Sequence, residues 1–81
     1  MNIFRHSIVS AVIGIILNIV LSLVFSLFAT KNEISPINGA SSLSFKSQIM
    51  HMLVHHKQVL FTSSLIVGLL VGISTYIALK L

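Results

Sequence analysis

Three histidines lie close together in the polar middle of the chain, and they are the side chains best suited to chemistry. His51 and His55 are four positions apart, and His56 follows directly. On a helix, two imidazoles at this spacing share one face, as metal sites on helices require. Two ligands do not close a metal site, however, and the chain has no Asp, Glu or Cys cluster to complete it. We therefore interpret the histidines as solvated or headgroup-facing. Two alternatives stay open. In the first, His51 and His55 are metal ligands; in the second, all three histidines form a pH-responsive group that protonates at about pH 6.

The supply of catalytic groups is otherwise very small. Glu33 is the only carboxylate in the chain, and there is no cysteine. Paired acids and carboxylate-oriented triads are therefore excluded, and so is a cysteine nucleophile. The serines lie in no local nucleophile motif. The sequence thus predicts a protein that is not an enzyme and that needs no cofactor.

Small and polar residues recur at helical spacing within two apolar stretches. Residues four apart stack on one face of a helix, and small side chains there let two helix backbones approach closely. Asn18 lies near the middle of the first stretch, so we expect its amide to hydrogen-bond across a helix interface. The predicted helix-packing residues are Ser10, Gly14, Asn18, Ser22 and Ser26 in the first stretch, and Ser64, Gly68 and Gly72, the last two a GxxxG motif, in the second.

The elements that carry these residues follow from the scarcity of charge. The chain has 81 residues, of which 56% are hydrophobic and only 7% charged, whereas a soluble domain carries about 25% charged residues. Residues 7–30 and 58–79 contain no charged side chain, and each run exceeds the roughly 20 residues that cross a bilayer as a helix. The predicted fold class is an all-α membrane protein, a two-transmembrane-helix hairpin with an amphipathic connecting helix.

The expected boundaries follow from the same charges and from a turn around Pro36 and Gly39. The alternative that the first stretch is a cleaved signal peptide fits poorly. The apolar stretch is too long, and Leu27 is a large side chain at a position where a cleavage site requires a small one. We predict a short basic N-terminal tail (1–6), a first transmembrane helix (7–30), a polar turn (31–41), an amphipathic interfacial helix (42–57) and a second transmembrane helix (58–80).

The connecting helix is predicted from apolar residues at helical spacing, with Phe45, Ile49 and Met52 on one side and polar residues largely on the other. Ser41 or Ser42 is the expected N-cap. No Pro or Gly separates this helix from the second apolar stretch, so it either bends near His56–Gln58 or runs straight on. Its apolar stripe indicates either an interfacial support for the hairpin or a docking surface for a partner.

Charge counting also bears on location. Three lysines lie in the loop, whereas Arg5 and Lys80 lie in the tails, so the positive-inside rule favours a cytoplasmic loop. The lysines are spread out without interleaved aromatics, so we expect no nucleic acid partner. We expect an integral protein of a bacterial inner membrane. The absence of an ionisable residue within either stretch argues against ion transport by this chain alone.

Two functions remain compatible with this pattern. The first is a non-enzymatic accessory or regulatory subunit that binds a larger membrane complex through helix–helix packing. The second is a self-associating, membrane-permeabilising protein of the holin or toxin type, in which the polar stripe of the first helix lines a pore. The expected partners are the lipid bilayer and either another membrane protein or further copies of this chain. Small or polar residues outside the main stripe favour such partners over packing within one chain; they are Thr62, Ser63 and Ser74.

Overall fold

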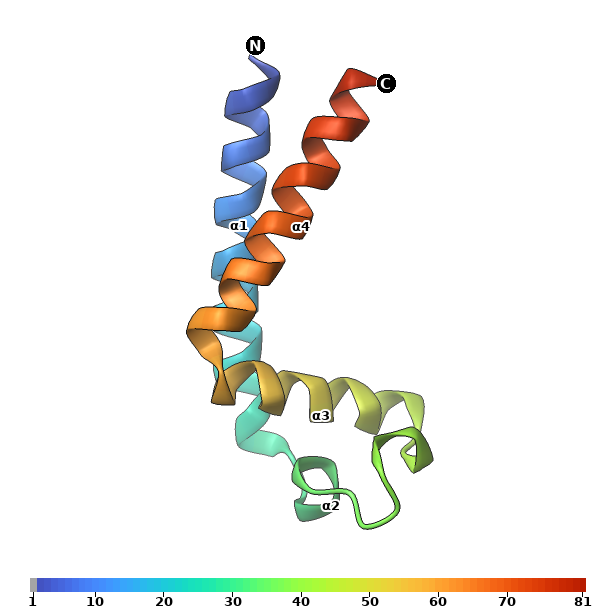
Figure 1. Ribbon diagram of the computed structural model, residues 1–81. Helices are drawn as coiled ribbons and strands as arrows, with labels where there is room; N and C mark the ends of the chain where they lie inside the picture. Colours follow the sequence, from blue (N-terminus) through green and yellow to red (C-terminus); the bar gives the residue numbers. More distant parts are fainter. Residues whose placement is uncertain (1) are drawn as a thin grey trace.

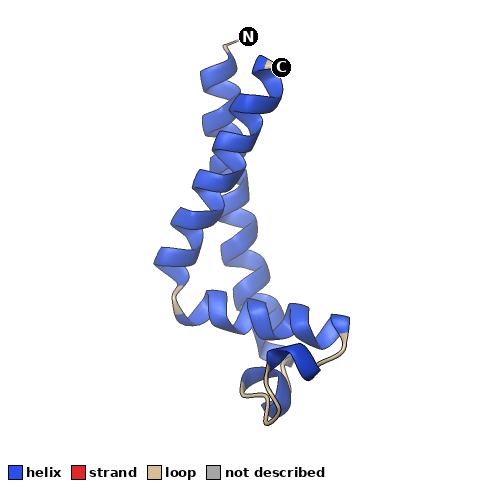
Figure 2. Cartoon of the chain, turned by 45° about the vertical axis from the view of Figure 1, so that its right-hand side comes forward, coloured by secondary structure: helices blue, strands red, loops and turns tan. Residues whose placement is uncertain are grey.

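The computed structural model describes residues 2–81, and these residues form helices joined by short turns (Figure 1). Two long helices lie side by side as an antiparallel pair, and shorter helices connect them at one end (Figures 1 and 2). The elements in chain order are α1 (Ile3–Phe25), the 3-10 turn η1 (Ser26–Phe28), α2 (Lys31–Ile34), the 3-10 turn η2 (Ala40–Ser42), α3 (Phe45–Gln58) and α4 (Leu60–Lys80).

Both long helices are long and apolar enough to cross a membrane. The first candidate span, Ile3–Phe28, has 26 residues, and the second, Leu60–Lys80, has 21. The helix α1 begins within the segment that charge counting assigns to the N-terminal tail, because the Asn2 side chain caps it by accepting from the amide of Phe4 at 2.7 Å. Arg5 and His6 therefore lie in the first turn of α1.

The glycines of the two long helices lie where α1 and α4 touch. A Cβ atom built on Gly68 would lie 2.8 Å from Cδ1 of Ile15, and one on Gly72 would lie 3.2 Å from Cβ of Ala11. On the other helix, a Cβ on Gly14 would lie 3.1 Å from Cγ2 of Val71. The absence of these side chains is what lets the two backbones approach so closely.

The distribution of burial is the reverse of that in a water-soluble domain. Among the described residues, the buried hydrophobic side chains are Leu43 and Val54, and neither belongs to a long helix. The long helices instead bury small or polar residues against each other and against α3, and they expose most of their Ile, Leu, Val and Phe side chains. The buried residues of α1 and α4 are Ser7, Gly14, Asn18, Ser22, Ser63, Ser64 and Gly68.

The connection contains a short helix, α2, that we did not predict within the polar turn. Thr30 accepts from the amide of Glu33 at 3.2 Å, and the Glu33 carboxylate accepts from the amide of Thr30 at 2.8 Å. This reciprocal pair is a capping box, and the spacing Thr30-x-x-Glu33 is its sequence signal. Gly39 then turns the chain with a φ of 86°, a conformation that suits glycine.

The connecting helix α3 begins three residues after its predicted start. Its N-cap is Ser44, which accepts from the amide of Ser47, rather than Ser41 or Ser42. It ends at Gln58, and Val59 (φ −124°, ψ 52°) breaks the helical path before α4. Of the two paths left open by the sequence, the chain takes the bend, and α3 lies across the end of the hairpin (Figures 1 and 2).

Cysteine cross-linking tests the contact between the long helices on a background without cysteine. We expect the pair Ala11→Cys and Gly72→Cys to form an intramolecular disulfide under mild oxidation. The Cβ atoms would lie 3.2 Å apart, slightly closer than the roughly 3.5–4.5 Å of disulfides. The matched pair Val12→Cys and Gly72→Cys places one thiol on the exposed face of α1 and should not cross-link. Equal cross-linking of both pairs would contradict this packing.

Candidate helix-packing site at the bend

The bend between α3 and α4 is stabilised by a side chain rather than by Gly or Pro. Across the bend, the backbone bonds are those from the amide of Val59 to the carbonyl of His55 (3.2 Å) and from the amide of Ser63 to the carbonyl of Val59 (2.8 Å). The hydroxyl of Ser63 lies 3.0 Å from the carbonyl oxygen of His56 and 3.2 Å from that of Leu60. Ser63 therefore donates its single proton to a carbonyl at the break.

Asn18 of α1 links both sides of this bend. Its Nδ2 donates to Oγ of Ser63 at 3.0 Å and to Oγ of Ser64 at 3.2 Å, and its Oδ1 lies 2.7 Å from Nδ1 of His56. We call Asn18, His56, Ser63 and Ser64 the elbow cluster. The cluster joins α1, α3 and α4 by hydrogen bonds. Each partner of Asn18 lies at least 38 positions from it in the sequence.

The hydrogen bonds of the elbow cluster determine the tautomer of His56. Because the proton of Ser63 goes to a carbonyl, Ser63 must accept from Asn18, and this orients Nδ2 of Asn18 toward the serines. Oδ1 of Asn18 then faces His56, and an amide oxygen only accepts. Nδ1 of His56 therefore carries a proton, and this hydrogen bond is the same for the neutral and the cationic imidazole.

The predicted packing residues of the first stretch differ in how deeply they are buried. Gly14, Asn18 and Ser22 are buried, whereas Ser10 and Ser26 are half-buried. Ser26 donates to the carbonyl of Leu23 in its own chain segment. Ser22 is fully buried, at 0% exposed, and its hydroxyl has no hydrogen-bond partner among the described residues.

The predicted residues of α4 lie on the side that faces α1. Ser64 and Gly68 are buried, and Gly72 is half-buried. Ser63, which we placed outside the main stripe as an argument for an external partner, is buried in the elbow cluster instead. Thr62 and Ser74 are exposed. The small-residue faces of the described residues therefore pack against each other within one chain.

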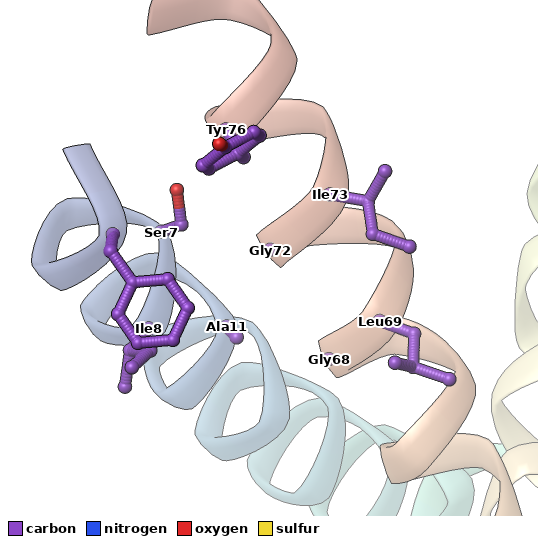
Figure 3. A pocket seen from close by; sticks show the side chains of 9 residues that line it. Ser7, Ile8, Ala11, Gly68, Leu69, Gly72, Ile73 and Tyr76 are labelled. Atoms are coloured by element: carbon purple, nitrogen blue, oxygen red, sulfur yellow. The ribbon is translucent and has the colours of Figure 1, made fainter.

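An apolar groove follows one side of this contact. Near the termini it has a volume of about 450 Å³, and Ala11, Gly68 and Gly72 line it where the two helices touch (Figure 3). A second hollow of about 570 Å³ lies closer to the bend, between Ile15 and Ile19 of α1 and the start of α4. The residues that line the first groove are Phe4, Ser7, Ile8, Ala11, Gly68, Leu69, Gly72, Ile73 and Tyr76.

His51 lies on the side of α3 that faces α2, and His55 is exposed beside it. Nδ1 of His51 lies 2.5 Å from the backbone carbonyl of Glu33, so it carries the proton and donates. The rings of His51 and His55 meet edge to face, with centroids 4.2 Å apart. Residues 2–81 contain no group of three or more His, Cys, Asp or Glu side chains that could hold a metal ion. His51 is thus engaged in joining α3 to α2.

Glu33 lies beneath α3, where hydrogen bonds stabilise its charged form. The amide of Thr30 contributes most to lowering the pKa of this carboxyl, followed by the hydroxyl of Ser47, and Lys46 adds a smaller electrostatic effect. Partial burial opposes these effects without cancelling them. The only carboxylate of the chain therefore serves as a helix cap and a contact between α2 and α3.

Sequence reasoning missed two members of the elbow cluster. His56 was grouped with the histidine pair, although its spacing from Phe45, Ile49 and Met52 already placed it on their face of the helix. Ser63 gave no signal of its own, because its role depends on the break at Val59. Comparison of the chain with known protein families, curated protein sequences and solved structures finds no match.

The elbow cluster predicts a strong effect of Asn18→Ala on hairpin stability. The substitution leaves the Nδ1 proton of His56 without its acceptor, and we expect a loss of about 1–2 kcal/mol. Energy transfer between dyes on the two long helices, measured during an SDS titration in mixed micelles, reports the unfolding free energy. Ser22→Ala is the matched control, because Ser22 is buried one turn away without a hydrogen-bond partner. Equal losses for the two variants would argue against the cluster.

The cap of α2 predicts a specific pH dependence. A carboxyl with a lowered folded pKa contributes stability above its unfolded pKa, and this contribution is lost as pH falls through the folded pKa. We therefore expect Glu33 to titrate below its ordinary value of 4.5 and α2 to stay capped down to that lower pH. NMR titration of the Glu33 carboxyl and the Thr30 amide measures this. Glu33→Gln keeps an acceptor for the cap and should remove the pH dependence of the Thr30 amide; titration of Glu33 at or above 4.5 would refute the assignment.

Proposed function

We propose that this chain is a small integral membrane protein that acts as a non-enzymatic accessory or regulatory subunit of a larger membrane complex. The observation that carries this proposal is the reversed burial of the hairpin. A water-soluble protein that exposed so many large apolar side chains on two long helices would aggregate. In hydrocarbon the same surface is well solvated, and the Asn18 amide inside the hairpin is hydrogen-bonded to Ser63 and Ser64.

The mode of association differs from the one first expected from the stripes. Gly68 and Gly72 face α1 of the same chain, so they support the hairpin itself. The groove beside them remains open, and its lining is almost entirely apolar. Such a surface suits an apolar transmembrane helix of a partner. That helix would make closer van der Waals contacts with the groove than lipid tails do.

The permeabilising alternative has less support in this conformation. It needs the polar stripe of α1 to face a pore. Asn18 and Ser22 are instead buried within the hairpin, and Asn18 is bound to α4. A pore would require the elbow cluster to open.

The proposed location is a bacterial inner membrane with the α2–α3 side in the cytoplasm. Its support is the count of basic residues: Lys31, Lys46 and Lys57 lie on that side, whereas Arg5 and Lys80 lie toward the other. By the positive-inside rule, this difference of one basic residue assigns the α2–α3 side to the cytoplasm.

Purification in mild detergent tests the subunit proposal. We expect the tagged chain to stay in the membrane fraction after alkaline extraction and to co-purify with a stoichiometric membrane partner. Replacing two groove residues, Leu69→Ala and Ile73→Ala, should reduce the recovered partner several-fold, because it removes apolar contacts without touching the α1–α4 interface.

The matched control is Leu70→Ala with Ile77→Ala. These side chains are similarly exposed but do not line the groove, so recovery of the partner should be unchanged. Release of the chain by alkaline extraction would contradict membrane integration. Recovery as a free monomer, or equal effects of the two double variants, would contradict the groove as the site of association.

A further inference from the structure

The helix α3 presents an apolar face that the other described residues leave largely exposed. Phe45 is 80% exposed, Ile49 44% and Met52 58%. Their spacing places them on one face of α3, and His56 continues that face at the end near the bend. The opposite face carries the buried Val54. This apolar face, formed by Phe45, Ile49 and Met52, is not part of the α1–α4 groove.

The hydrogen bond of His56 shows which way this face points. His56 contacts Asn18, and Asn18 also contacts Ser63 and Ser64, which lie beyond the bend within α4. Asn18 is therefore on the hairpin side of α3. The residues that share the face of His56 point toward that side too, away from α2.

The other face of α3 is covered by the connection. His51 donates to the carbonyl of Glu33, and the nearby hydroxyl of Ser47 helps to lower the pKa of the Glu33 carboxyl. In Figure 1, α2 lies on the side of α3 opposite to the long helices. The transverse helix thus has an apolar side toward the hairpin and a polar connection on its outer side.

Positive charge lies along one edge of the apolar face. Lys46 and Lys57 are eleven positions apart, which is three helical turns, so they share one edge of α3, and both are exposed. Gln48 and His55 occupy the other edge. The single acid of the region, Glu33, caps α2 through the amide of Thr30 and interacts weakly with Lys46. Lys46 and Lys57 outnumber this one acid, so a net positive charge remains to attract an anionic surface.

We propose that the apolar face of α3 binds an anionic phospholipid surface, with Phe45, Ile49 and Met52 among the upper acyl chains and Lys46 and Lys57 at the phosphates. An interfacial helix with lysines beside an apolar face that includes Phe is suited to this position. The transverse direction of α3 keeps its full length at one depth (Figure 2). The inference rests on the membrane integration proposed above, but it does not depend on a protein partner.

Tryptophan fluorescence tests the proposal, because the chain contains no Trp. The full chain carrying Phe45→Trp is reconstituted in vesicles of phosphatidylcholine and phosphatidylglycerol, with bromine on the acyl chains of one lipid or the other. We expect quenching by brominated lipid, protection from aqueous acrylamide, and a preference for brominated phosphatidylglycerol of up to about fivefold for each contributing lysine.

Two charge variants identify the source of that preference. Lys46→Gln with Lys57→Gln should abolish the preference for phosphatidylglycerol at Phe45→Trp. Arg5→Gln with Lys80→Gln removes the same number of charges from the other end of the hairpin and should leave it unchanged. Equal quenching by the two brominated lipids in the chain that carries only Phe45→Trp would overturn the anionic surface as the ligand. Equal effects of the two charge variants would overturn it too.

A second tryptophan position separates this inference from the proposed function. Ile16→Trp places the probe on an exposed position of α1, where it is quenched by brominated lipid if the long helices span the bilayer. Acrylamide access at Phe45→Trp together with lipid quenching at Ile16→Trp would overturn the lipid-binding face alone. Acrylamide access at both positions would overturn membrane integration and this inference together.

Discussion

The arrangement of the helices depends on the requirement that the Asn18 amide, placed inside an apolar helix pair, be fully hydrogen-bonded. Its two donors and its acceptor reach α4 and α3 at the same time. One side chain thereby fixes the register of α1 against α4 and the position of α3 beside them. It also selects the protonated nitrogen of His56, because the serine beside it is already committed to a backbone carbonyl.

Close backbone packing and hydrogen bonding act on neighbouring parts of the same contact. Near the bend, polar side chains hold the helices together; farther along, Gly68 and Gly72 let Ile15 and Ala11 come close. Neither device needs the hydrophobic effect, which supplies no attraction between helices when the surroundings are lipid. This explains how a hairpin can be specific while its large apolar side chains point outward.

Much of the fold could be predicted from where charge is absent. Two long uncharged stretches predict two apolar helices, and the described residues form such helices packed as a hairpin. The partners of Asn18 could not be predicted, because they depend on how two helices are rotated against each other, which helical periodicity does not determine. The sequence placed a possible bend near His56–Gln58, next to the observed break at Val59. It could not decide between a bend and a straight helix, because the break has no Pro or Gly and involves Ser63. The capping box of α2, by contrast, was readable at Thr30 and Glu33.

The break at Val59 also constrains how deep the molecule can lie in a bilayer. A continuous helix would pair the carbonyls of His56, Lys57 and Gln58 with amides of α4; only that of His56 is taken over, by Ser63. The other two carbonyls belong to exposed residues and need water or headgroups. In the proposed membrane setting, the break would therefore stay at the polar boundary. From there the 21 residues of α4 extend about 32 Å, close to the hydrocarbon thickness of about 30 Å. Since the break cannot sink, a thinner bilayer would have to be matched by tilting of the whole hairpin, and a thicker one by local thinning of the bilayer around it.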